Sequence, residues 1–186
     1  MSIHTASAQR EAFSAHRRLL SQALGLSLGS SLMLSHKPAH SVQPSANPEQ
    51  AQDFTLAGSQ GPLQLSRVEG ALVYLDFWAS WCAPCKLSFP WMQAMHERYQ
   101  ESGLVILAIC LDKDSREATA FLQQAKPRFS ILFDEQATTP QRYDIKAMPS
   151  SFFIRPKSLT MLHKHAGFRS QDQAALERLI QSFLQR

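Results

Sequence analysis

Apolar and polar residues follow one another along this chain in blocks that predict strands and helices in turn. Two nearly continuous apolar runs, 71–78 and 104–111, are typical of strands buried on both faces of a sheet. A helix is predicted between them, from Ala83 to Tyr99. Its apolar side chains recur every four residues and would line one buried face: Leu87, Trp91, Met95 and Tyr99.

Shorter segments complete the predicted order of elements. Further strands are expected at 54–56, 63–65, 130–133, 151–154 and 159–165. Further helices are expected at 115–124, 137–143 and 171–184. The alternation of strands and helices predicts an α/β fold, a three-layer sandwich with a central sheet flanked by helices. No helix separates the last two strands, so they should pair antiparallel and make the sheet mixed.

The N-terminal part of the chain has a different character. The basic pair Arg17–Arg18 precedes a moderately apolar run, 19–35, which is followed by the small residues Ala39 and Ser41. This order predicts a signal peptide over residues 1–41. The alternatives are an uncleaved membrane anchor and an N-terminal extension of a cytosolic protein. Residues 42–52 are rich in Pro, Ser, Gln and Ala and predict a disordered linker, so the folded domain should span 53–186.

The net positive charge of the chain does not by itself indicate a nucleic-acid partner. The net charge is +4, but residues 1–41 carry four basic residues and one acid. The remainder has 15 Lys and Arg against 14 Asp and Glu, and its basic residues are scattered singly. Because phosphate binding needs a basic stripe, we expect no nucleic-acid partner.

The candidate reactive residues are the three cysteines of the chain: Cys82, Cys85 and Cys110. Cys82-Ala-Pro-Cys85 lies where a buried strand meets a helix, and its spacing allows a disulfide to form and open without moving the fold. A zinc site would need a second ligand pair, and a c-type haem site would need His where Lys86 stands. A structural disulfide across so short a loop would stabilise little. A redox pair is therefore predicted, without metal or cofactor, and Cys110 should be a buried core thiol.

The two cysteines are expected to have different roles. Cys82 would stand at the helix N-terminus, where the dipole favours the thiolate that attacks a disulfide. Cys85, one turn further, would be shielded until it resolves the mixed disulfide. Asp76, in an otherwise apolar strand, has two interpretations. It is either a carboxylate hydrogen-bonded to nearby backbone, or a buried acid with raised pKa that takes the proton from Cys85.

The sequence resembles the thioredoxin superfamily, most closely its exported TlpA/ResA-like branch, over about residues 53–184. The segments that carry the resemblance are LDFWASWCAPC at 75–85, Phe89–Pro90, AMPSSFFI at 147–154 and HAGFRS at 165–170. The insertion at 115–133 is typical of the TlpA branch. The resemblance implies a Cys82–Cys85 disulfide, a catalytic Asp76, and a cis Pro149 facing the disulfide. Trp81, Met148 and Pro149 would contact substrate.

The function implied is that of a periplasmic thiol–disulfide oxidoreductase, a monomer that reduces client proteins with cysteine pairs and is recycled by a membrane redox partner. Ser88 departs from the branch, since many members have Glu there, which weakens the transfer of a narrow cytochrome-maturation role. One alternative is an oxidase or isomerase that introduces disulfides. Another is a copper-delivery or metal-binding module that uses Cys82, Cys85 and a histidine. His163 and His165 form a possible metal pair, and several methionines could also suggest copper.

Overall fold

The structure is a computed structural model that describes residues 49–59 and 61–186. The predicted signal segment, 1–41, and most of the predicted linker lie outside the described residues. Within the described part of the chain, no helix is both long and apolar enough to cross a bilayer.

The strands and helices follow the predicted order closely. The strands are β1 (Thr55–Gly58), β2 (Leu63–Gln64), β3 (Leu72–Trp78), β4 (Leu104–Cys110), β5 (Ser130–Phe133), β6 (Ser150–Arg155) and β7 (Thr160–Ala166). The α-helices are α1 (Ala83–Tyr99), α2 (Ser115–Ala125), α3 (Thr138–Arg142) and α4 (Gln173–Leu184). Three short 3-10 turns accompany them: η1 (Leu65–Arg67), η2 (Gln100–Ser102) and η3 (Ser170–Asp172). Most predicted bounds differ from these by one or two residues.

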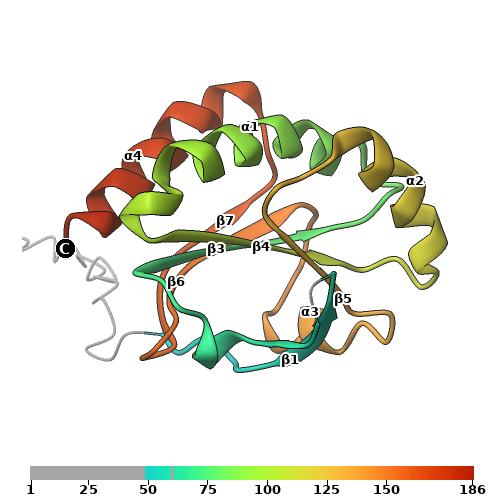
Figure 1. Cartoon of the computed structure of the whole chain (residues 1–186), viewed down its shortest axis with the longest axis horizontal. Coiled ribbons are helices and arrows are strands. Elements are labelled where there is room, and N and C mark those ends of the chain that lie inside the picture. Colours follow the sequence, from blue (N-terminus) through green and yellow to red (C-terminus); the bar gives the residue numbers. More distant parts are fainter. Residues whose placement is uncertain (1–48, 60) are drawn as a thin grey trace, which may run out of the picture. The chain divides into compact units, whose positions relative to one another are not determined.

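The described strands form one mixed sheet in the order β2-β1-β5-β4-β3-β6-β7. β3, β4 and β5 are parallel neighbours, whereas β6 is antiparallel to β3 and to β7. The predicted antiparallel pairing of the last two strands is therefore confirmed. Figure 1 shows α1, α2 and α4 over one face of this sheet and α3 on the other side. The predicted α/β sandwich is confirmed, with the α3 side thinner than the α1 side.

Side chains of the central strand β3 alternate between these two layers, as the pleat requires. Tyr74 and Trp78 pack into the apolar cluster that contains Cys85 and the buried side chains of α1 and α4. Val73, Leu75 and Phe77 pack into the cluster on the α3 side. Asp76 shares the parity of Tyr74 and Trp78, so its carboxylate lies on the α1 face of the sheet.

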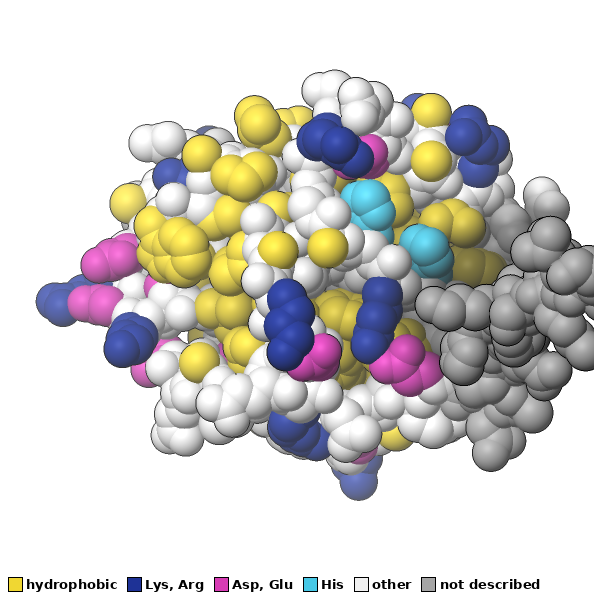
Figure 2. Space-filling model, turned by 180° about the vertical axis from the view of Figure 1, so that it is seen from behind, with side chains coloured by type: hydrophobic (Ala, Val, Ile, Leu, Met, Phe, Trp, Pro, Cys, Tyr) yellow, Lys and Arg dark blue, Asp and Glu magenta, His cyan; other side chains and the backbone are white. Residues whose placement is uncertain are grey.

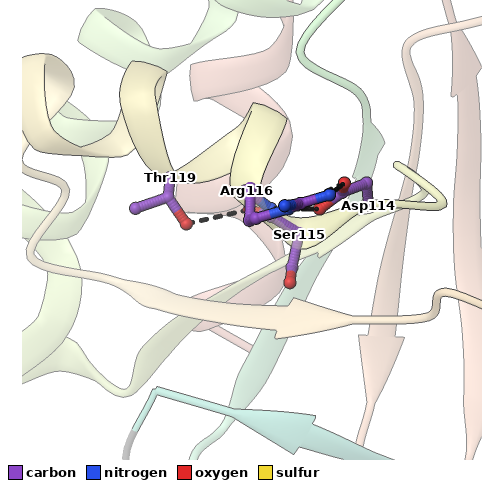
Figure 3. A network of polar contacts seen from close by, with 4 residues as sticks. All are labelled: Asp114, Ser115, Arg116 and Thr119. Atoms are coloured by element: carbon purple, nitrogen blue, oxygen red, sulfur yellow. Dashed lines mark hydrogen bonds and ion pairs between the residues drawn. The ribbon is translucent and has the colours of Figure 1, made fainter.

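Helix α2 begins with a polar network that satisfies its first turn (Figure 3). Asp114 is the N-cap, and its side chain accepts a hydrogen bond of 2.9 Å from the backbone N–H of Arg116. The Arg116 guanidinium turns back onto the same carboxylate. Thr119 donates its hydroxyl to the carbonyl of Ser115 at 2.8 Å. Because a capping carboxylate binds free N–H groups and opposes the helix dipole, this sequence fixes where the α2 insertion starts.

The buried face of α1 differs from the predicted one at its start. Leu87 is 68 % exposed, although the four-residue spacing placed it with Trp91 and Met95 on the buried face. Trp91 and Met95 are buried as expected. The prediction for Leu87 is wrong because a row of every fourth residue drifts by about 40° per step around a helix of 3.6 residues per turn. Here that drift carries the row's first member out to solvent.

Residues just before the predicted domain start at Asp53 already pair with the sheet. The N–H of Ala51 donates to the carbonyl of Leu159, and the N–H of Met161 donates to the carbonyl of Glu49. Residues 49–51 thus lie along the start of β7, and the Ala51 side chain is buried. A segment that pairs with an edge strand gains backbone hydrogen bonds, so it can be ordered without a long apolar run of its own.

Surface charge is mixed in sign on the face drawn in Figure 2, where Lys and Arg side chains lie next to Asp and Glu side chains. Ion pairs such as Lys146–Asp144 and Lys164–Glu49 are exposed at both partners. Exposed pairs of this kind contribute little stability, so the fold depends mainly on its two apolar clusters.

Candidate active site

The Cys82–Cys85 pair occupies the first turn of α1. Cys82 is the N-cap, and the backbone N–H of Cys85 donates a hydrogen bond of 3.3 Å to the Cys82 sulfur. The two cysteines form a disulfide with their Cα atoms 5.3 Å apart. Pro84 stands in the first turn, where its missing N–H leaves no carbonyl unpaired. A thiolate on Cys82 would therefore face the unpaired N–H groups and the positive end of the helix dipole.

The two sulfurs differ in the direction from which they can be reached. Cys85 is fully buried in the apolar cluster under α1. Cys82 is nearly buried too, but it lines an open groove with a volume of about 650 Å³. The other groove residues come from the active-site turn, the end of β4, α3 and the loop before β6: Trp81, Ala83, Pro84, Leu111, Ala137, Pro140, Ile145, Lys146, Ala147 and Met148. An incoming disulfide can therefore meet Cys82 but not Cys85.

The groove is apolar and carries one prominent aromatic side chain. Trp81 is 69 % exposed, which is unusual for a side chain of its size. Lys146 is the cationic residue in the groove lining, and its ammonium group pairs with Asp144. The structure thus brings the predicted substrate residues Trp81 and Met148 together around Cys82. Exposed apolar surface around a reactive sulfur suits an apolar segment of another protein.

The loop before β6 is held at the groove by backbone and hydroxyl contacts. The Met148–Pro149 peptide bond is cis. The carbonyl of Pro149 accepts a hydrogen bond of 2.7 Å from the N–H of Gly167, at the end of β7. Ser150 donates its hydroxyl to the carbonyl of Ala147 at 2.7 Å. Pro149 is buried whereas Met148 is partly exposed, so the predicted contact residues differ in their exposure.

Asp76 is 1 % exposed and lies on the same face of the sheet as Cys85. Burial raises the pKa of its carboxyl well above the ordinary range, because the charged form is desolvated there. Its Oδ2 atom has no hydrogen-bond partner among the described residues. Of the two sequence interpretations, a buried acid fits these facts better than a carboxylate satisfied by nearby backbone.

Ser88 cannot replace the glutamate that the resemblance led us to compare it with. Its side chain is fully buried and donates a hydrogen bond of 2.7 Å to the carbonyl of Cys85, one turn earlier in α1. A hydroxyl bound in this way has no acid–base function at neutral pH. Asp76 is a buried carboxylate on this side of the disulfide.

Asp112 is a residue of the site that the sequence analysis did not single out. It follows β4, is 2 % exposed, and accepts the backbone N–H of Ser80 on both carboxylate oxygens, at 3.1 and 3.0 Å. Ser80 lies two residues before Cys82, so this contact holds the turn that leads into the active site. The sequence does show an acidic residue directly after the buried run 104–111. It does not show that this residue binds Ser80, because that contact depends on how β3 and β4 pair.

Cys110 is a buried free thiol, as predicted. Burial raises its pKa to about 12, and its sulfur lies 3.5 Å from Asp112. A thiol with so high a pKa carries almost no thiolate at neutral pH and reacts slowly.

The candidate metal ligands do not come together. Within 49–59 and 61–186, no three His, Cys, Asp or Glu side chains lie close enough to hold a metal ion. Met92 and Met95 are core residues of α1. His165 lies beside Asp172 rather than beside a cysteine.

Comparison with known proteins agrees with this geometry. The family model described as the AhpC/TSA family matches residues 48–160, more than half of the chain. The chain belongs to the AhpC/TSA family. In this AhpC/TSA protein the matched segment includes the active-site turn of α1 and the loop at Pro149.

Named relatives and solved structures point to thiol–disulfide chemistry. "Thiol-disulfide oxidoreductase ResA" of Oceanobacillus iheyensis is 37 % identical over 97 residues, 52 % of this chain and 50 % of that protein. The chain thus matches only half the length of that relative. A structure from Chlorobium tepidum, described as a candidate thiol:disulfide interchange protein DsbE, is 43 % identical with a TM-score of 0.71. The match covers 74 % of this chain and 96 % of the chain in that structure.

A third comparison bears on the fold. The exposed lipoprotein thioredoxin Etrx1 of Streptococcus pneumoniae is 26 % identical, with a TM-score of 0.59. The match covers 70 % of this chain and 99 % of the Etrx1 chain. The predicted thioredoxin-like fold is confirmed by these similarities.

Proposed function

We propose that this AhpC/TSA protein is an exported thiol–disulfide oxidoreductase that reduces disulfides in client proteins. The observation that carries the proposal is the arrangement of the Cys82–Cys85 disulfide. One sulfur lines an open apolar groove at a helix N-terminus, and the other is fully buried one turn behind it. That asymmetry suits a pair in which one thiol attacks and the other resolves.

The reaction balances over two exchanges. In the reduced protein, the Cys82 thiolate attacks one sulfur of a client disulfide, and the other client sulfur leaves as a thiolate. Cys85 then loses its proton to Asp76 and attacks the Cys82 sulfur. The Cys82–Cys85 disulfide forms, and the second client sulfur leaves. Two electrons have passed to the client, so a dithiol partner must reduce the pair again. A membrane redox partner is the proposed source of those electrons.

Client recognition is proposed to use the groove. Trp81 and Met148 offer apolar contact beside Cys82, and the backbone around Met148 can pair with an extended client segment. Cysteine-containing proteins are the substrates implied by the names of the relatives. Pro149, buried in the same loop, is proposed to hold Met148 at the groove.

Export is proposed from residues outside the described part of the chain. The basic pair and apolar run in residues 1–41 suit a signal peptide, with a linker over residues 42–52 before the folded domain. The similarity to an exposed lipoprotein thioredoxin also supports export. We propose that the protein works in the periplasm as a monomer, either free or held by an uncleaved signal.

The proposal is tested by turnover of a disulfide-bonded model protein with dithiothreitol as reductant. The wild-type protein should accelerate reduction, and Cys82→Ser should remove the acceleration completely because it lacks the attacking sulfur. Cys110→Ser is the matched control, since it removes the buried thiol, and it should keep the wild-type rate. Equal acceleration by wild type and Cys82→Ser would refute the proposal.

A further inference from the structure

Three polar side chains stand in one row across the strands beside the active site. Asp76 of β3 is paired with Ser151 of β6, and Ser151 is paired in turn with His165 of β7. Residues directly opposite in antiparallel strands project from the same face of the sheet, about 5 Å apart at their Cβ atoms. The row therefore lies on the α1 face, where Asp76 already faces the cluster that contains Cys85.

Both ends of this row carry a buried atom that lacks a hydrogen bond. Asp76 Oδ2 and His165 Nε2 are each inaccessible to solvent and have no partner among the described residues. Buried polar atoms are nearly always paired, so two such atoms in one row need a physical reason. Ser151 is the residue paired with both Asp76 and His165 across the strands, and a hydroxyl can donate one hydrogen bond while it accepts others.

The Tyr74 phenol belongs to the inner end of the same group. Burial raises its pKa well above the ordinary range, the Asp76 carboxylate raises it further, and a hydrogen bond with Ser151 acts in the opposite direction. Tyr74 therefore lies within reach of both other groups. On the opposite side of Asp76, the paired residue of β4 is Ala108, which offers no polar atom. The polar row continues only toward β6 and β7.

The outer end of the row is at the edge of the sheet. β7 is the last strand on that side, and the His165 side chain is 22 % exposed. Its Nε2 atom lies 3.7 Å from Asp172 Oδ2 in η3, and Arg169 binds the same carboxylate. His163 is the other titratable neighbour, two residues earlier on the same face of β7. An imidazolium at His165 would thus face a carboxylate close to solvent.

We propose that Ser151 and His165 are positioning residues that relay the proton taken up by Asp76 to the edge of the sheet. This inference rests on the proposed function. A client bound over the groove covers Cys82, and Asp76 is itself buried, so the proton from Cys85 needs an internal path. Asp76 passes its proton to the Ser151 hydroxyl as that hydroxyl gives its own proton to His165. The imidazolium then passes the proton to the Asp172 carboxylate, which lies 3.7 Å from Nε2, and Asp172 releases it to water. One proton leaves, and no electrons move in this relay.

The test is the decay of a preformed mixed disulfide between Cys82 and a model protein, followed at pH 7 in single turnover. Ser151→Ala and His165→Gln should each slow decay by about tenfold, since each removes one member of a general acid–base chain. Formation of the mixed disulfide should stay within about twofold of wild type. His163→Gln is the matched control on the same strand face and should decay at the wild-type rate. Added imidazole should restore decay in His165→Ala but leave wild type unchanged.

The outcomes separate the relay from the function on which it rests. If either Ser151→Ala or His165→Gln decays at the wild-type rate while Asp76→Asn is slow, the relay is wrong and the redox function stands. A merely structural role for His165 would give slow decay without rescue by imidazole, which also overturns the relay. If wild type forms no mixed disulfide at all, the proposed function is wrong and the relay is overturned with it.

Discussion

Asp76→Asn is expected to slow decay of the mixed disulfide by about 100-fold at pH 7, within the usual range for loss of a general base. Cys85 is fully buried and must lose a proton before it can attack. Asp76 is a buried carboxylate on the same face of the sheet, and Ser88 is occupied with a backbone carbonyl. Asn keeps the shape of the side chain but cannot take a proton. The attack by Cys82 precedes this step and should change little.

The same substitution should alter stability with a defined dependence on pH. The pKa of Asp76 is raised in the folded protein, so the folded state binds the proton more tightly than the unfolded state. The free energy of unfolding of wild type should therefore fall as pH rises from about 4 toward the raised pKa. Asp76→Asn removes this pH-dependent loss of stability. The variant should be at least as stable as wild type at pH 7, and its relative advantage should disappear below about pH 4.

Stopped-flow measurement of mixed-disulfide formation and decay, together with urea unfolding at several pH values, checks both parts. Asp144→Asn is the matched control, because it removes an exposed carboxylate beside the groove residue Lys146. It should leave decay unchanged. Normal decay in Asp76→Asn would show that Asp76 is only a structural residue.

Cys85→Ala is expected to stop the reaction after the first exchange. Cys85 lies one helical turn from Cys82, with 5.3 Å between their Cα atoms, so its sulfur acts within the same molecule. Effective concentrations for well-placed groups reach about 10⁵ M or more, far above any external thiol. Without Cys85, decay must depend on external thiols and should be slower by about 10³-fold or more.

Non-reducing electrophoresis and mass spectrometry would detect the accumulated adduct on Cys82 in Cys85→Ala. Cys110→Ala is the control, since the buried Cys110 thiol should not resolve anything. Decay at the wild-type rate in Cys85→Ala would mean that another group resolves the adduct. That outcome would remove Cys85 from the mechanism.

The sequence was most informative where local signals agree. Helix α1 begins and ends at the predicted residues, because the strand–helix junction at Cys82 and the following apolar pattern mark it clearly. The runs 71–78 and 104–111 became β3 and β4 with ends shifted by one residue. Both are buried on both faces, so their composition alone identified them.

Features that depend on strand pairing could not be predicted in the same way. The contact between Asp112 and Ser80 requires β3 and β4 to pair in one particular register. The row that joins Asp76 to Ser151 and His165 requires two further registers. Ser151 looked like an ordinary strand residue, because nothing in its own neighbourhood indicates which side chain lies opposite.

The exposure of Leu87 could not be predicted from the sequence either. Periodicity shows which residues of a helix share a face, but not how far that face extends under its neighbours. Leu87 lies in the second turn of α1, and only the assembled structure shows that the core cluster does not reach it.

Equilibration of the whole protein with thiol–disulfide buffers of known potential tests the central claim most directly. Alkylation and mass spectrometry would give the fraction of molecules in which Cys82 and Cys85 are reduced. A reversible two-electron transition is expected between about −270 and −120 mV, the span from thioredoxin to DsbA. A disulfide that stays oxidised below about −300 mV would be a structural bond and would contradict the account.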